Sequence, residues 1–165
     1  MIAKFYRKWF ILAILFLLPV IFLLFLYPST HNYNTLDIVG EDINEIDSPT
    51  FINQNSSNFK DNITILSFLG NSPMKNITSA LNLKELVYDK FKGFKKFQLL
   101  MIVPNGSEDQ VNELLLELYA YDELKYWGFA FGSSDQIKSL HSSLKSSNAL
   151  NSDMSSPYIF IVDKD

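Results

Sequence analysis

The feature that most constrains this chain is a run of apolar residues near its N-terminus. The stretch WFILAILFLLPVIFLLFLY, residues 9–27, contains nineteen residues and no charged side chain. As an α-helix with a rise of 1.5 Å per residue it would be about 28 Å long, close to the hydrocarbon thickness of a bilayer. We therefore predict one transmembrane helix from Trp9 to Tyr27, which contacts the lipid bilayer along its length and has these two aromatic rings at the interfaces.

Basic residues before this run predict its orientation. Lys4, Arg7 and Lys8 precede the span, whereas residues 29–47 are polar to acidic. The positive-inside rule then places the basic N-terminus, residues 1–8, in the cytoplasm and the rest of the chain outside it. We expect a cell (inner) membrane protein whose domain is on the periplasmic or other extracytoplasmic side. A cleaved signal peptide is the alternative, but its apolar region is usually shorter and ends in small residues, whereas this run ends in Leu-Tyr-Pro. We expect an uncleaved signal-anchor.

The remainder of the chain is acidic and contains no cysteine. The whole sequence has 14 Lys and Arg against 18 Asp and Glu; three of the basic residues precede the span, so residues 28–165 carry 11 − 18 = −7. A negative domain repels nucleic acids, so that class of partner is excluded. The absence of cysteine excludes thiol chemistry and thiolate metal sites. Two histidines, His31 and His141, supply a metal centre poorly, so we expect no metal and no cofactor.

Beyond the span, the chain divides into a polar segment and an apolar-rich domain. Residues 28–62 keep apolar remnants only in TLDIVG and TFINQ and are predicted to be a linker with short strands. From Ile63 onward apolar runs alternate with helical patterns. The predicted strands are 63–69, 97–103, 126–131 and 158–162, and the predicted helices between them are 74–92, 107–124 and 135–146. The domain is therefore predicted to span residues 63–165.

The strand and helix patterns indicate an α/β sandwich. A continuous apolar strand such as FQLLMIV (97–103) suits a sheet covered on both faces, and helices of these lengths can cross over between parallel strands. Ser107 is a candidate cap for the second helix. Core stripes are predicted on the first helix at Ile77, Leu81, Leu83, Leu86 and Val87, and on the second at Val111, Leu114, Leu115 and Leu118.

The C-terminal end of the sequence predicts a strand and a turn, with the second strand of the hairpin missing. Residues 162–165, VDKD, are typical of a turn that leads into another strand. A hairpin without its second strand would leave an open sheet edge. We therefore expect the domain to be truncated at its C-terminus.

One loop gives the domain a family resemblance. The strand ITILSFL runs into GNSPMKN and then a helix; a second Ser-Pro, Ser156-Pro157, comes just before the last predicted strand, and the chain closes with FIVDKD. In these features residues 36–165 resemble the thioredoxin-like superfamily, and most closely its membrane-anchored Sco/SenC copper-chaperone branch. The resemblance implies an N-terminal anchor and a thioredoxin-like sandwich, a central sheet with helices on both faces.

The residues that carry the chemistry of that branch are replaced in this sequence. Its members bind copper for cytochrome oxidase assembly through a CPxxxCP-like loop and a later histidine. Ser72 stands at the first cysteine and is followed by the matching Pro73, Asn76 stands at the second, and the histidine position falls near Ser155, close to Pro157. Hydroxyl and amide groups cannot replace soft sulfur ligands. We expect a degenerate site that keeps only the scaffold, with a groove for an extended peptide and a Ser-Pro bond that is cis in thioredoxins.

These features predict a non-enzymatic function with two alternatives. The leading hypothesis is a membrane-anchored domain that binds a protein of a membrane complex, in respiratory oxidase assembly. The first alternative is a serine-dependent enzyme using Ser72, Ser155 or Ser156. That role needs an activating base, and His141 lies on a predicted helix with no visible partner, so we interpret it as a surface residue. The second alternative is a structural subunit of a membrane complex.

Three further patterns have ordinary interpretations. The aromatic-rich segment YDELKYWGFAF (121–131) is predicted to be a buried strand with its flanks. The basic segment FKGFKK (91–96) is predicted to be a solvated helix end, with Gly93 as the stop. The acidic residues Asp122, Glu123, Asp163 and Asp165 lack calcium-loop spacing and are interpreted as turn and cap residues.

Overall fold

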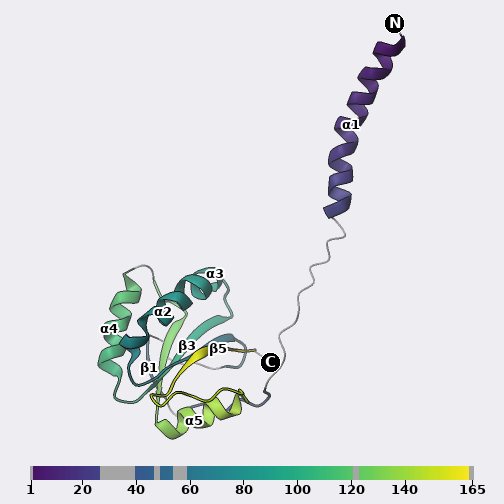
Figure 1. Cartoon of the computed structure of the whole chain (residues 1–165). Helices are drawn as coiled ribbons and strands as arrows, with labels where there is room; N and C mark the ends of the chain where they lie inside the picture. The colour runs from purple at the N-terminus through teal and green to yellow at the C-terminus, as the bar shows by residue number, and fades with distance from the viewer. Residues whose placement is uncertain (1, 27–39, 47–48, 54–58, 121–122, 164–165) are drawn as a thin grey trace. The chain divides into compact units, whose positions relative to one another are not determined.

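The computed structural model of the chain describes residues 2–26, 40–46, 49–53, 59–120 and 123–163. The chain forms two units, Met1–Asp37 and Ile38–Asp165. The first unit contains helix α1, and the second contains a five-stranded sheet with its covering helices (Figure 1). The second unit thus begins well before Ile63, where the sequence places the start of the dense core.

Helix α1 (Ile2–Leu26) is the predicted apolar helix, but it begins at Ile2 and not at Trp9. The stretch Tyr6–Phe25, 20 residues with a mean hydropathy of 2.6, is long and apolar enough to cross a membrane. A signal sequence near the N-terminus passes the same test of length and composition. Pro19 lies inside the helix without ending it. Tyr27, the predicted end of the span, lies outside the described residues.

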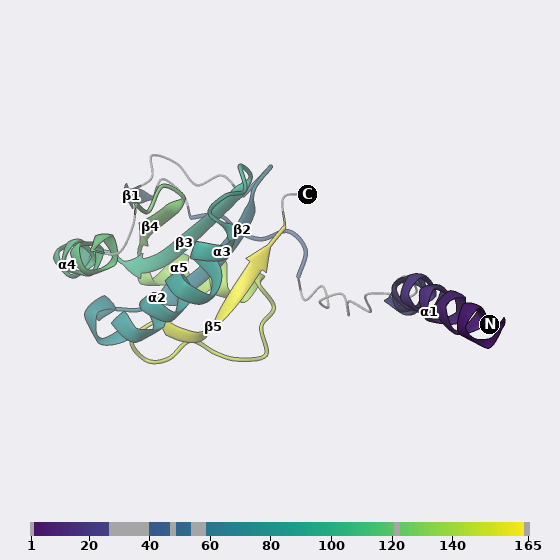
Figure 2. The same ribbon diagram turned by 90° about the horizontal axis from the view of Figure 1, so that it is seen from above.

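The sheet has the strand order β1-β4-β3-β2-β5. Its strands are β1 (Thr50–Ile52), β2 (Ile63–Leu69), β3 (Phe97–Pro104), β4 (Trp127–Gly132) and β5 (Ser155–Val162). The three central strands are parallel, as the sequence predicts, whereas β1 pairs antiparallel with β4 and β5 antiparallel with β2. Figure 2 shows β1 and β5 at opposite edges of the sheet.

The helices lie on both faces of this sheet. A 3-10 turn η1 (Pro73–Asn76), α2 (Ile77–Leu83), a π-helical segment η2 (Lys84–Tyr88) and α3 (Asp89–Phe91) follow β2, and α4 (Glu108–Tyr119) follows β3. Right-handed crossovers from β2 to β3 and from β3 to β4 place both of these helical layers on one face. Strand β4 is followed by α5 (Ser134–Ser143), which covers the other face of the sheet (Figure 1). The chain then forms β5, which pairs with β2.

Alternate residues of the central strand feed two separate cores. Leu99, Met101 and Val103 of β3 point to the core under α2 and α4, whereas Leu100 and Ile102 point to the core under α5. The aromatic strand β4 is buried as predicted, with Trp127, Phe129 and Phe131 in the larger core. The smaller core is completed by Ile43 and Ile46, which precede β1 and pack against it.

The predicted core stripe of the first helical segment is wrong at its end. Leu86 is 62% exposed, whereas Tyr88 is buried and Lys84 is only 5% exposed. The buried side of this segment is formed by Ala80, Leu83, Lys84, Val87 and Tyr88, at the i, i+3, i+4, i+7 and i+8 spacing of one helix face, and Leu86 lies off that face. The prediction missed this face because lysine and tyrosine are residue types that favour the surface.

The predicted cap position of Ser107 is confirmed, whereas the predicted place and geometry of Ser156-Pro157 are wrong. Ser107 has the N-cap position of α4 but makes no capping hydrogen bond; its hydroxyl donates to the Asn71 carbonyl oxygen at 3.5 Å. The Ser156-Pro157 peptide is trans, and both residues lie inside β5 and not before it.

The buried Lys84 forms an ion pair with Asp89. Its Nζ lies 3.0 Å from Oδ2 of Asp89, and Nζ of Lys92 lies 3.2 Å from Oδ1 of the same residue. Burial raises the pKa of Asp89, but hydrogen bonds from Lys84 and Lys92 outweigh that effect, so the pKa is lowered from its ordinary value of 3.8. The ionised carboxylate is therefore favoured in the folded state.

We predict that Asp89→Asn destabilises the domain and changes its acid response. The substitution removes the negative charge that Asp89 places beside the buried Lys84, and we expect a loss of about 1–3 kcal/mol at neutral pH, less than for a fully buried pair because Asp89 is partly exposed. Because the folded pKa of Asp89 is lowered, this stability is present above pH 3.8 and is lost as the pH falls through the folded pKa.

The measurement is urea unfolding of the detergent-solubilised chain, followed by fluorescence of the buried Trp127, at neutral and acid pH. Glu85→Gln is the matched control, because Glu85 is an exposed carboxylate on the same helical segment. Equal stabilities of the Asp89 and Glu85 variants at neutral pH would contradict the structural role of Asp89.

Candidate functional site

The loop after β2 brings several of the predicted site residues together. The side-chain amide of Asn76 donates to the Leu69 carbonyl oxygen at 2.7 Å and so closes the loop across η1. Pro73 is buried at the start of η1, and the Ser72 carbonyl oxygen accepts a hydrogen bond from the Lys75 amide at 3.0 Å. Of these residues, Asn76 and Pro73 stabilise the loop and Ser72 is partly exposed.

Ser155, the position expected for the family histidine, lies at the start of β5 beside this loop. It pairs with Leu69 at the end of β2, and the Asn71 amide donates to the Asp153 carbonyl oxygen at 2.8 Å. The predicted positions near Ser72 and Ser155 therefore meet at the carboxyl end of β2. Pro157 lies two residues further along β5, with an exposed ring.

The Ser155 hydroxyl has structural partners on both sides. It donates to Oδ1 of Asp153 at 2.6 Å and accepts from the Asn151 side-chain amide at 2.9 Å. Hydrogen bonds from the Ser155 side chain and backbone lower the pKa of Asp153 from its ordinary value of 3.8. A carboxylate with a lowered pKa is a weak base, so this pair holds the turn and is poorly suited to activate a nucleophile.

Close approach of the two loops depends on Gly70. Its φ is +73°, and a Cβ at this position would lie 2.5 Å from the Asp153 carbonyl oxygen and 2.8 Å from the Ser155 nitrogen. Both contacts are with backbone atoms, which cannot move aside as a flexible side chain could. Only glycine fits this position.

We predict that Gly70→Ala destabilises the domain by about 2–4 kcal/mol, from left-handed strain together with the backbone clash. The matched control is Gly93→Ala, because a Cβ at Gly93 meets nothing within 4 Å. We expect the control to change stability by no more than about 0.5 kcal/mol. Urea unfolding of both variants measures the difference, and a Gly70→Ala chain as stable as the Gly93→Ala chain would show that the two loops do not touch.

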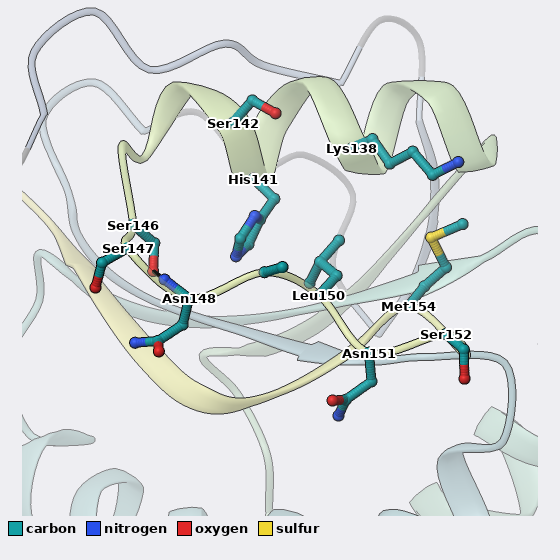
Figure 3. A pocket seen from close by; sticks show the side chains of 11 residues that line it. Lys138, His141, Ser142, Ser146, Ser147, Asn148, Leu150, Asn151, Ser152 and Met154 are labelled. Atoms are coloured by element: carbon teal, nitrogen blue, oxygen red, sulfur yellow. Dashed lines mark hydrogen bonds between the residues drawn. The ribbon is translucent and has the colours of Figure 1, made fainter.

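Next to this turn lies an open cavity of about 770 Å³ between α5 and the loop that leads to β5 (Figure 3). Its lining is mostly hydroxyl and amide groups, with one lysine and one histidine. The lining residues are Lys138, His141, Ser142, Ser146, Ser147, Asn148, Ala149, Leu150, Asn151, Ser152 and Met154. Asn151 belongs both to this cavity and to the Ser155 turn.

His141 is the most buried titratable group at this cavity. Figure 3 shows its ring between α5 and the loop of Ser146 and Asn148. The ring meets Phe68 edge-on at a centroid distance of 5.3 Å and Phe160 at 5.8 Å. Its Nε2 is buried and has no hydrogen-bond partner among the described residues. Burial lowers the pKa of His141 from its ordinary value of 6.5, so the ring is neutral at pH 7.

The interpretation of His141 as a surface residue is therefore wrong, because only 8% of it is exposed. Its position in the sequence carried the signal: Ile137, Leu140, His141 and Leu144 have the i, i+3, i+4, i+7 spacing of a buried helix face. For His141, the polar residue type favoured a surface position, whereas the helical spacing favoured a position in the core. His31, the other histidine, lies outside the described residues.

We predict that His141→Phe removes an acid-sensitive part of the stability. A neutral buried histidine stabilises the fold fully above pH 6.5, the ordinary pKa, and less as the pH falls towards the lowered folded pKa, because the unfolded chain binds the proton more tightly. Phenylalanine keeps the ring contacts without the unpaired nitrogen. Unfolding at about pH 7.5 and about pH 5 should show a smaller pH effect in this variant. A His31→Phe chain, which keeps His141, should behave as the parent; an unchanged pH effect in His141→Phe would contradict the assignment.

The chemistry available here is hydrogen bonding. In the part of the chain that the structure describes, no three His, Asp or Glu side chains lie close enough to hold a metal ion. Of the predicted acidic turn residues, Glu123 and Asp163 are described, whereas Asp122 and Asp165 lie outside the described residues. Serine and asparagine side chains can bind polar groups of a ligand or peptide.

Comparisons with known proteins give no relative from which a function could be transferred. No family model matches the chain, and no curated protein and no solved structure matches it.

Proposed function

We propose that this chain is a membrane-anchored protein-binding domain without catalytic chemistry. The observation that carries the proposal is the outer edge of β5, an exposed apolar strand at the rim of the sheet. The anchor is α1, with its N-terminus in the cytoplasm and the Ile38–Asp165 unit on the periplasmic side. Support for this orientation comes from the three basic residues Lys4, Arg7 and Lys8.

Among the described residues β5 is an edge strand, and half of its length suits pairing with a further strand. The strand pairs with β2 on one side, and no described residue forms a strand on the other. The first half of β5 is poorly suited to pair with another strand, because Pro157 has no amide hydrogen and the Tyr158 amide donates to the Ser156 hydroxyl at 3.1 Å. In the second half, residues 159–162, every residue has an amide hydrogen and a carbonyl oxygen, and those on the outer side can pair with an added strand. Here Ile159 is 47% exposed and Ile161 is 54% exposed. Such an edge is a template for an added strand.

The charge of the domain favours a different protein over a second copy as the occupant. Residues 28–165 carry −7, so two copies repel each other, whereas an extended segment flanked by Lys or Arg is attracted. Backbone hydrogen bonds to β5 would provide affinity, and Ile159 and Ile161 would select apolar side chains at alternate positions.

A thioredoxin-like scaffold of the Sco/SenC kind is the fold that we propose for this domain. The five-stranded sheet with helices on both faces supports it, as does the loop and helix that follow β2. At the family's ligand positions, Asn76 and Ser155 are committed to bonds within the fold. On this basis we propose binding in place of copper delivery, with the partner among proteins that assemble a respiratory oxidase.

The test is site-specific photo-crosslinking in native membranes. A benzophenone side chain replaces Tyr158 in the full chain, and cross-linked products are purified and identified by mass spectrometry. We expect one dominant heterologous protein, and we expect its yield to fall about tenfold or more with Ile159→Lys and Ile161→Lys together, since about 1.4 kcal/mol corresponds to a factor of ten.

The matched control is Leu116, which is 74% exposed on α4, far from β5 in the sheet order. A benzophenone at this position should not capture the same protein, and Leu116→Lys should not reduce capture from position 158. Equal products from both positions, or cross-links only between copies of this chain, would overturn the proposal.

A further inference from the structure

Exposed aromatic rings gather where α3 ends and β3 begins. Phe91 and Phe94 are 46% and 63% exposed, and their ring centroids are 6.1 Å apart. Phe91 also lies 5.9 Å from Phe97, which is buried at the start of β3. The Phe94 amide donates to the Phe91 carbonyl oxygen at 2.9 Å, so the turn holds both rings in place. The three rings therefore form one apolar cluster at this turn.

The same turn carries the strongest positive charge of the domain. Residues 84–96 contain five lysines and two acids, or +3, whereas the rest of residues 28–165 contains six basic and sixteen acidic residues, or −10. Lys84 and Lys92 pair with Asp89, and Lys90, Lys95 and Lys96 are exposed beside the rings. A positively charged surface within an otherwise acidic domain favours a negatively charged partner.

We propose that this lysine-phenylalanine patch, defined as Lys90, Phe91, Phe94, Lys95 and Lys96, binds the anionic headgroups of the bilayer and holds the domain against the membrane. Exposed aromatic rings flanked by lysines are the combination that lies in a membrane interface, with rings among the acyl chains and ammonium groups at the phosphates. Each lysine near an anionic surface adds to the attraction.

The anchor explains why so small a patch is sufficient. A few lysines and two rings would bind a vesicle weakly from free solution, but α1 keeps the domain at high local concentration beside the bilayer. Ile63 extends the apolar surface, since it is 42% exposed and its amide donates to the Lys96 carbonyl oxygen at 2.8 Å. The inference rests on α1 spanning the bilayer, and it does not depend on a protein partner at β5.

The absence of cysteine from the chain allows a direct test. Gly93→Cys places a unique spin label between the two rings, at a position where a Cβ meets nothing within 4 Å. The full chain is reconstituted into nanodiscs of phosphatidylcholine alone, or of phosphatidylcholine and phosphatidylglycerol in equal parts. Collision of the label with oxygen and with a water-soluble nickel complex then reports whether position 93 lies in lipid or in water.

We expect the label at position 93 to be shielded from nickel in the anionic discs and exposed in the neutral discs. Changing Lys90, Lys95 and Lys96 together to Gln should lower the ratio of docked to undocked domains roughly 100-fold, and high salt should act in the same direction. A label at Leu116→Cys on α4 should be exposed to nickel in every sample.

Two outcomes would overturn the proposal. The first is a label at position 93 that is as exposed as the label at position 116 in both kinds of disc. The second is shielding that is the same in both lipids and unchanged by the three glutamines, which would show a contact that does not depend on headgroup charge. Neither outcome affects the cross-linking at β5, so failure of the patch and failure of the protein-binding proposal can be told apart.

Discussion

The burial of β3 on both faces is the constraint on which the rest of the domain depends. All eight residues from Phe97 to Pro104 are buried, so apolar side chains leave the strand in both directions and each set needs a cover. Parallel pairing with β2 and β4 supplies the neighbours, and the crossover connections supply the helices. Helices on a single face would leave Leu100 and Ile102 in water.

The two faces are covered unequally, and the candidate site follows from that difference. One face has the α2–α3 stretch and α4, whereas the other has α5 and the short segment of Ile43 and Ile46. Asn44 fixes this segment to α5 through bonds to Ser139 and Ser143. On the remaining part of that face the loop before β5 covers the sheet, with His141 against Phe68 and Phe160, and the polar cavity lies where that cover is thin.

The two edges of the sheet differ in length and in how much apolar side chain they expose. The edge strand β1 has three residues and is tied down by the Asn53 side chain, which donates to the Leu124 and Trp127 carbonyl oxygens. The opposite edge, β5, has eight residues and half-exposed isoleucines. The lysines gather at the turn between α3 and β3 while the rest of the domain is acidic, so this turn favours a negatively charged partner and the remaining surface a positively charged one.

The sequence by itself determined the apolar N-terminal helix, the α/β class and the position of all four predicted strands, because long apolar runs and helical stripes are local patterns. Composition also excluded cysteine chemistry. Tertiary structure alone decided the antiparallel placement of β5 beside β2, since strand partners are chosen by contacts distant in sequence. It also decided that Lys84 and His141 are buried, although both residue types predict the surface. The Lys84 ammonium group pairs with Asp89, and Phe68 and Phe160 pack against the His141 ring. The meeting of Gly70 with Asp153 and Ser155 likewise joins loops more than eighty residues apart, which no local pattern reveals.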